Sequence, residues 1–180
     1  MSAPDPIMDR RNELIGQYEL IHQSKSNYGC SSEDILGPIM RVFSKFEGIG
    51  SILDYGCGRS RTVDWLAKLL DARAYRYDPA IPEFSTLPLK ECDAVICTDV
   101  LEHIAKEDMQ NVISDIASIS HLVYFNICTR PAGTILPNGE NAHCTVETDE
   151  WWFSFLQDTF PLIKKIHSPR KQNVSLITIG

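Results

Sequence analysis

The sequence lacks the long apolar runs that mark membrane proteins. No stretch approaches the roughly 20 apolar residues that a membrane-spanning helix needs. Residues 1–10 contain Pro4, Pro6 and charges of both signs, and they lack the apolar centre of a secretory signal. Internal repeats and low-complexity segments are absent as well. These absences predict a cytoplasmic protein with no membrane partner.

Paired cysteine motifs and a basic surface are missing too. The 6 cysteines form no C-x-x-C pair, and two of them lie inside apolar runs, so we expect reduced and mostly buried thiols. A formal net charge of -7 disfavours long nucleic acid, because its phosphates require a broad cationic surface. A small-molecule substrate is the expected partner, a terminal nucleotide needs no such surface, and no residue pattern indicates the oligomeric state.

What the sequence does contain is an alternation of helical and strand patterns. A chain of 180 residues suits one core. Apolar positions within residues 14–21 and 35–46 recur at helical spacing and predict a helical N-terminal cap over residues 1–48. In residues 49–180, the first expected strand begins at Ile52, and further strands are expected at 74–77, 94–97, 122–127 and 174–179. Helices are expected at 62–70, 109–119 and 151–160. This order predicts a single domain with a three-layer α/β fold and a mainly parallel, twisted sheet, which binds ligands beyond the carboxyl ends of its strands.

A glycine-containing turn follows the first expected strand. Asp54 ends the strand, and Gly56 and Gly58 lead towards the next helix. Glycine lets the backbone approach a ligand closely, because a side chain at either position would obstruct the turn and the contact. The start of the helix offers free N–H groups to a carboxylate. By itself the pattern predicts either a ligand site or an ordinary strand-to-helix turn.

The wider segment resembles motif I of class I methyltransferases that use S-adenosylmethionine (SAM). Residues 53–58 read L-D-Y-G-C-G, and the resemblance implies that Asp54 faces the amino group of the cofactor's methionine end. The cofactor-binding residues implied by this motif are Asp54, Tyr55, Gly56, Cys57 and Gly58. Ser60 stands at the usual third glycine of the motif, which is tolerated if the helix has begun there.

Two further segments extend the resemblance. Asp78 ends the second strand about twenty residues after the loop, where a carboxylate would accept hydrogen bonds from both ribose hydroxyls, with Pro79 beside it. Residues 92–104, C-D-A-V-I-C-T-D-V-L-E-H-I, are similar to the family's fourth strand and the loop after it. This segment adds Thr98, Asp99 and Val100 to the implied cofactor site. Three matches in order imply a Rossmann-like methyltransferase fold with SAM as cofactor.

The chain also departs from the family pattern. Only residues 80–91 separate the second strand from the next one, too few for the family's usual helix and strand. We therefore expect a sheet trimmed after the second strand and an adenine pocket made by loop residues such as Ile81, Phe84 and Leu87. The alternative, a nicotinamide-binding Rossmann domain, would carry a small residue where Arg61 stands.

Two histidines are the candidate catalytic residues. His103 follows the fourth-strand motif, and His143 comes from a later loop. An imidazole with an ordinary pKa of about 6.5 can act as a general base. The alternative for His103 is a structural role beneath the cofactor.

The same loop offers an alternative with a divalent metal. Glu102, His103 and His143 are candidate ligands, and Asp99 lies one turn away. The layout resembles methyltransferases of the 3′-terminal ribose of small RNAs and ubiquinone-pathway O-methyltransferases, which carry E-x-x-E-H and a later His. Asp99 replaces the first Glu of that pattern and shortens its reach.

The N-terminal helices supply the candidate substrate-binding residues Tyr18, His22 and Tyr28, unless these helices only cover the sheet edge. Taken together, the sequence predicts a SAM-dependent methyltransferase that methylates a small polar acceptor at an oxygen. The alternatives are a metal-dependent 2′-O-methyltransferase acting on a terminal ribose and a SAM-binding domain without turnover.

Overall fold

The computed structural model describes residues 5–179. Residues 1–4 and 180, which belong to the expected cap and core ranges, lie outside the described residues. The helices are α1 (Pro6–Ser24), α2 (Leu36–Phe43), α3 (Thr62–Leu70), α4 (Met109–Ile119) and α5 (Asp149–Gln157). The strands are β1 (Ser51–Tyr55), β2 (Arg73–Tyr77), β3 (Ala94–Thr98), β4 (Val123–Cys128), β5 (Ile163–Ile166) and β6 (Asn173–Thr178).

Within the described residues, the strands form a 6-stranded sheet in the order β2-β1-β3-β4-β6-β5. β1 pairs in parallel with β2 and β3, β3 pairs in parallel with β4, and β6 runs antiparallel to both β4 and β5. Every position of β1, β3 and β4 is buried, which explains why apolar residues predominate in them. The expected mainly parallel α/β fold is confirmed.

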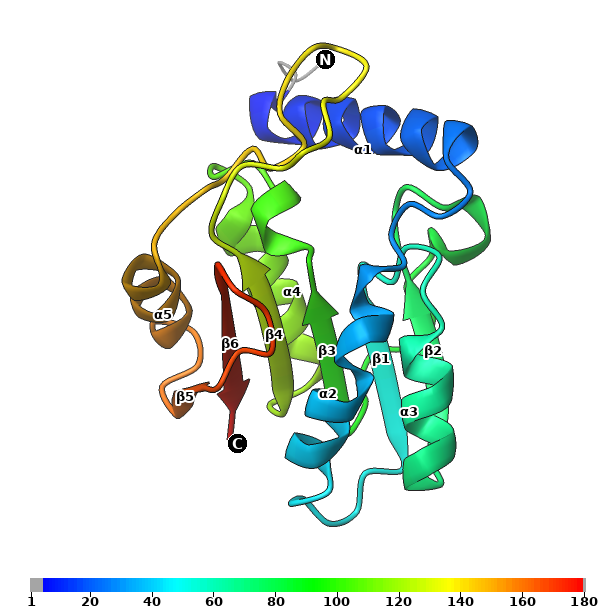
Figure 1. Ribbon diagram of the computed structural model, residues 1–180, viewed down its shortest axis with the longest axis vertical. Coiled ribbons are helices and arrows are strands. Elements are labelled where there is room, and N and C mark those ends of the chain that lie inside the picture. Colours follow the sequence, from blue (N-terminus) through cyan, green and yellow to red (C-terminus); the bar gives the residue numbers. More distant parts are fainter. Residues whose placement is uncertain (1–4, 180) are drawn as a thin grey trace.

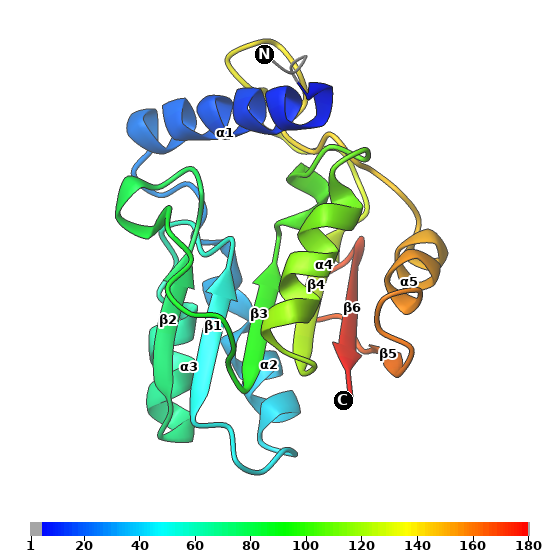
Figure 2. The same cartoon turned by 180° about the vertical axis from the view of Figure 1, so that it is seen from behind.

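Helices cover both faces of the sheet, which gives three layers (Figures 1 and 2). On one face, α2 and α3 contribute the buried side chains Ile39, Phe43 and Leu66. On the other face, α4 and α5 contribute a second cluster that includes Ile113 and Trp152. Both clusters are made almost entirely of apolar side chains, so the sheet is stabilised by burial on its two sides.

The helix α1 crosses the end of the sheet where the parallel strands finish (Figure 1). Asp5 caps its start by accepting a hydrogen bond from the Ile7 N–H at 3.0 Å. Arg11 then joins the helix to the buried carboxylate of Asp108, with two N–O distances of 2.5 Å. Of the two N-terminal helices expected to form a cap, only α1 lies over this end. Along α2, the apolar face packs directly onto the sheet.

The connection between β2 and β3 is short. In the part of the chain that the structure describes, it contains one brief 3-10 turn, Pro82–Phe84, and no further strand. The predicted trimming of the sheet after the second strand is therefore confirmed. Among residues 5–179, no helix combines the length and the apolar character needed to cross a membrane.

Candidate functional site

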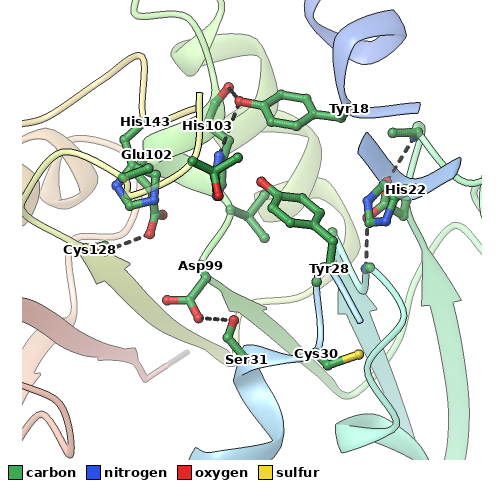
Figure 3. Close-up of a pocket in the computed structure, with 18 of the residues that line it drawn as sticks. Tyr18, His22, Tyr28, Cys30, Ser31, Asp99, Glu102, His103, Cys128 and His143 are labelled. Atoms are coloured by element: carbon green, nitrogen blue, oxygen red, sulfur yellow. Dashed lines mark hydrogen bonds between the residues drawn. The ribbon is translucent and has the colours of Figure 1, made fainter. Parts of the chain in front are cut away.

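A cavity of about 750 Å³ lies under α1, at the carboxyl ends of the parallel strands (Figure 3). Its walls come from α1, the segment after it, the glycine turn, and the loops that follow β2, β3 and β4. Its lining includes Tyr18, His22, Tyr28, Gly56, Gly58, Asp78, Pro79, Asp99, Val100, Glu102, His103, His143, Arg170 and Asn173. The candidate catalytic, substrate-binding and metal-ligating residues all face this one cavity.

The turn after β1 requires glycine at two positions. Gly56 and Gly58 have positive φ angles of 79° and 53°. A Cβ at Gly58 would lie 2.5 Å from the carbonyl oxygen of Gly29, and a Cβ at Gly56 would overlap the side chain of Val100. The Gly56 and Cys57 N–H groups donate to the Tyr77 carbonyl at 2.8 and 3.0 Å, which fastens the turn to the end of β2.

Asp78 holds the glycine turn from the end of β2. Its carboxylate accepts hydrogen bonds from the Gly58 N–H at 2.8 Å and the Ala80 N–H at 2.9 Å. Each carboxylate oxygen has two lone pairs, so both oxygens can accept a further hydrogen bond from a ligand in the cavity. The residue predicted to meet the ribose therefore also fixes the position of the loop predicted to meet the methionine end.

Four of the predicted cofactor residues do not line this cavity. Tyr55, Cys57 and Thr98 are buried elsewhere, and the Tyr55 hydroxyl donates to Asp115 of α4 at 2.7 Å. Asp54 is buried outside the cavity lining, and its Oδ2 has no hydrogen-bond partner within residues 5–179. Burial, with Asp78 nearby, raises the pKa of Asp54 to about 8. Direct contact between Asp54 and a methionine amino group stays a prediction.

Ser60 takes a role different from the expected one. The helix α3 begins at Thr62 rather than at Ser60. The Ser60 hydroxyl accepts hydrogen bonds from the Thr62 N–H at 3.0 Å and from the Ser32 hydroxyl at 2.7 Å. The serine therefore binds the N–H of the first residue of α3 and joins it to the segment between α1 and α2.

Three side chains near the cavity wall form a candidate cation site. Glu102, His103 and His143 each offer a ligand atom, and these three atoms lie within 4.8 Å of one another. Glu102 and His103 come from the 3-10 turn after β3, and His143 comes from the loop after β4. The Cys128 N–H donates to Glu102 Oε1 at 2.8 Å, while Oε2 is buried without a partner in the described chain.

Backbone carbonyls set the orientation of both imidazoles. His103 Nδ1 lies 2.8 Å from the Ala142 carbonyl oxygen, and His143 Nδ1 lies 2.6 Å from the Arg130 carbonyl oxygen. A carbonyl only accepts, so each Nδ1 carries the proton and each Nε2 presents a lone pair. This is the arrangement that metal-ligating histidines have in proteins.

The pKa values of all three groups are shifted from those of solvent-exposed side chains. Burial and the neighbouring His143 lower the pKa of His103 to about 4, so its imidazole is neutral near pH 7. Burial also lowers the pKa of His143. Burial and the nearby Asp99 raise the pKa of Glu102 to about 8. A cation bound between these groups would favour the ionised form of Glu102, because its positive charge would balance that of the carboxylate.

Asp99 does not join these three residues as the sequence pattern suggested. It has a φ of 54°, and its Oδ2 accepts hydrogen bonds from Ser31 and Arg170, both at 2.6 Å (Figure 3). Asn173 donates to the other oxygen at 3.3 Å. Asp99 is not part of the group formed by Glu102, His103 and His143, and its carboxylate is held by Arg170 instead.

The cap residues lie close to the candidate cation site. The Tyr18 hydroxyl donates to the Ala142 carbonyl at 2.7 Å, the same oxygen that His103 uses, and lies 3.2 Å from His103 Nδ1. His22 and Tyr28 pack edge to face, with ring centroids 5.2 Å apart. Tyr18, His22 and Tyr28 thus line the cavity, and their predicted role in binding substrate stays a prediction.

Arg170 and Asn173 were missed at the sequence level. They precede and open β6, which runs antiparallel to β4. An antiparallel strand begins where its parallel neighbours end. The signal that could have found them is a polar and basic segment just before the last expected strand, at residues 167–173.

Comparison with known proteins gives structural matches only. No family model and no curated protein sequence matches the chain. The 1,6-didemethyltoxoflavin-N1-methyltransferase of Burkholderia thailandensis, solved with S-adenosylhomocysteine and 1,6-didemethyltoxoflavin bound, has a TM-score of 0.60 at 13% identity, covering 99% of this chain and 91% of that chain.

Two further structures agree in architecture. A SAM-dependent methyltransferase from Archaeoglobus fulgidus has a TM-score of 0.55 at 18% identity, covering 81% of this chain and 93% of that chain. The methyltransferase domain of bacterial CtHen1-CN has a TM-score of 0.58 at 13% identity, covering 80% and 97%. The protein is thus a Rossmann-like α/β domain with its ligand cavity at the carboxyl ends of the strands. Its fold is that of the class I SAM-dependent methyltransferases.

Proposed function

We propose that this protein is a SAM-dependent methyltransferase that methylates an oxygen of a small polar acceptor. We further propose that it holds a divalent cation between Glu102, His103 and His143. One observation carries the proposal: these three residues face the same cavity as the glycine turn and Asp78. A cofactor and an acceptor bound there would share one cavity.

The cofactor half of the cavity suits the methionine and ribose parts of SAM. Gly56 and Gly58 both line the cavity, and their positive φ angles shape the turn that presents the backbone to it. Asp78 keeps free lone pairs for the ribose hydroxyls while it holds the turn. When bound, SAM supplies an electrophilic methyl group on its sulfonium. The protein's own task is then to align the acceptor with that methyl group.

The acceptor half suits a hydroxyl bound to a divalent cation. Glu102 Oε2 is unpartnered in the described chain, and the Nε2 atoms of both histidines present lone pairs, which is a 2-His-1-carboxylate set. A cation in this position supplies a Lewis acid that lowers the pKa of a bound hydroxyl. The cap residues Tyr18 and Tyr28 then shape the space around the acceptor.

A terminal ribose is a second acceptor of the same chemistry, since it offers two neighbouring hydroxyls. The net charge of -7 argues against a long RNA but does not affect the terminal nucleotide itself. The test is therefore one assay with two sets of acceptors. Formation of S-adenosylhomocysteine is measured with SAM and a panel of small hydroxyl compounds, then with short RNA, each with Mg²⁺, Mn²⁺ or a chelator.

Turnover that requires a divalent ion supports the proposal, and the productive acceptor class identifies the substrate. Turnover that persists in chelator would remove the cation from the proposal. Binding of S-adenosylhomocysteine without turnover on any acceptor would favour a SAM-binding domain instead.

The affinity for Mn²⁺ should depend steeply on pH. Glu102 must be ionised to bind a cation, and its pKa is raised to about 8. Below that value each pH unit raises the ionised fraction about tenfold, so the affinity should increase by about tenfold from pH 6 to pH 7. Glu102→Gln should bind Mn²⁺ weakly and with a much smaller slope. Electron paramagnetic resonance of free Mn²⁺ measures both, and equal slopes in the two proteins would contradict the assignment of Glu102.

A further inference from the structure

Arg130 lies beside the candidate cation site. It comes just after β4, which ends at Cys128, and it lines the cavity that holds the site. Its carbonyl oxygen accepts the hydrogen bond from His143 Nδ1 at 2.6 Å. The residue that orients one candidate ligand therefore also carries a guanidinium group next to that ligand.

The loop that carries Arg130 is held in place by Asn141. Asn141 Oδ1 accepts hydrogen bonds from the N–H groups of Ala132 and His143, both at 2.9 Å. Its Nδ2 donates to the Ala132 carbonyl at 2.9 Å. These three bonds hold residues 130–132 against residues 141–143, so the backbone of Arg130 keeps a fixed position relative to His143.

The two arginines that line the cavity in the described chain differ in their partners. Arg170 donates to Asp99 at 2.6 Å and also to the Ser31 carbonyl. Arg130 is exposed, and among residues 5–179 it has no acidic partner. Its side chain donates there only to the neighbouring Pro131 carbonyl, at 3.4 Å. A guanidinium has five N–H donors, so that of Arg130 can bind a ligand without giving up an ion pair.

Backbone donors of the same loop also line the cavity. The N–H groups of Gly133 and Thr134 have no acceptor within the described part of the chain. An arginine side chain and backbone N–H groups are the donors with which proteins recognise carboxylates and phosphates. The loop after β4 therefore presents donors suited to an anion next to the candidate cation site.

The charges on the wall also favour an anionic acceptor. Outside the cofactor half, the acidic side chains in the cavity lining are Asp34, Asp99 and Glu102. Arg170 balances Asp99, and a bound divalent cation would more than balance Glu102. Arg130 and the remaining charge of the cation would then outweigh Asp34. An anionic group on the acceptor would offset this surplus of positive charge.

We propose that Arg130 binds an anionic group, a carboxylate or a phosphate, on the acceptor. The inference rests on the proposed function, because it assumes that a cation between Glu102, His103 and His143 holds the acceptor hydroxyl. Since Arg130 adjoins His143, the anion lies only a few bonds from that hydroxyl. The acceptor class is therefore narrowed to short hydroxy acids and to phosphates of polyols and sugars.

The test compares acceptors that differ only in the anionic group. One set is glycerol, glycerate and glycerol 3-phosphate, and the second is ribose and ribose 5-phosphate. Formation of S-adenosylhomocysteine is measured with SAM at a constant concentration of free Mn²⁺. In the unmodified protein, kcat/KM should be at least about tenfold higher for an anionic acceptor than for the neutral member of its set. The higher of the carboxylate and phosphate values identifies the anion.

Three variants test whether Arg130 causes this preference. Arg130→Gln should lower the ratio of the two kcat/KM values to less than about twofold, because the charge is lost. Arg130→Lys keeps the charge but loses the planar fork, so it should retain part of the ratio. Arg41→Gln removes an exposed arginine of α2 outside the cavity lining, and this matched control should keep the full ratio.

The outcomes separate this inference from the function on which it rests. A ratio near one in the unmodified protein, or a ratio that Arg130→Gln leaves unchanged, overturns the inference while the methyltransferase function stands. If no acceptor of any class is methylated, the proposed function fails and the inference fails with it. Partial unfolding of a variant lowers both rates equally and leaves their ratio unaffected, so poor folding does not imitate the expected result.

Discussion

Replacing His143 by alanine should lower the rate of divalent-ion-dependent methyl transfer by about 100- to 1000-fold, which corresponds to about 3–4 kcal/mol of transition-state stabilisation. The Nε2 of this histidine is held towards Glu102 and His103 by the bond from its Nδ1 to the Arg130 carbonyl. Without it, two ligands remain and the acceptor hydroxyl loses its activating cation. Initial rates of S-adenosylhomocysteine formation at saturating SAM measure the effect.

The matched control for this change is His167→Ala. His167 is exposed and does not line the cavity that holds the candidate cation site. Its removal should leave the rate within about twofold of the unmodified protein, since surface substitutions rarely perturb the fold. A rate in His143→Ala equal to that in the control would show that the cation site has been placed wrongly. Turnover by the unmodified protein that is unchanged in chelator would show the same.

Gly58→Ala should destabilise the protein by about 2–5 kcal/mol and abolish measurable binding of S-adenosylhomocysteine. A left-handed alanine costs about 1–2 kcal/mol, and forcing an atom into a packed contact adds about 1–3 kcal/mol. The added Cβ would lie 2.5 Å from the oxygen and 2.9 Å from the Cα of Gly29. Both atoms belong to the backbone, so the segment between α1 and α2 has to move away from the glycine turn.

Gly48→Ala separates these two contributions. Gly48 has a φ of 77°, and nothing in the described chain lies within 4 Å of a Cβ built there. It should therefore lose only the backbone term of about 1–2 kcal/mol and keep its ligand affinity. Urea unfolding and calorimetry give both quantities. Equal losses of unfolding free energy in the two variants would mean that the close contact between Gly29 and Gly58 does not contribute to stability.

The parts of the fold that the sequence predicted are those whose burial is uniform. Residues 94–97 and 122–127 are predominantly apolar because β3 and β4 are covered on both faces. β5 escaped prediction because its sequence, I-K-K-I, exposes both lysines at the sheet edge. An edge strand with two charged positions has neither the alternation nor the apolar run of a buried strand.

The sequence could predict only those parts of the site whose place in the sheet follows from the order of the strands along the chain. Glu102, His103 and His143 follow neighbouring parallel strands, so their loops meet at one edge of the sheet. The pairing of Asp99 with Arg170 depends on the segment that precedes β6, at the other end of the chain. The walls of a neighbouring cavity beside α4 come from α1, α4 and the ends of β1 and β2. No local sequence pattern indicates a space formed by elements so far apart in the chain.

The position of α1 also bears on the order of events in a catalytic cycle. Tyr18 of this helix lines the cavity at the carboxyl ends of the strands and also the neighbouring cavity beside α4. The helix is held to the rest of the domain through Arg11 and Asp108. The same helix therefore covers the cavity that holds the candidate cation site and the neighbouring space beside α4. Under the proposed function, a displacement of α1 that frees S-adenosylhomocysteine would also uncover the methylated product. Movement of α1 would then control the release of both molecules. Product release of this kind limits the turnover of many enzymes.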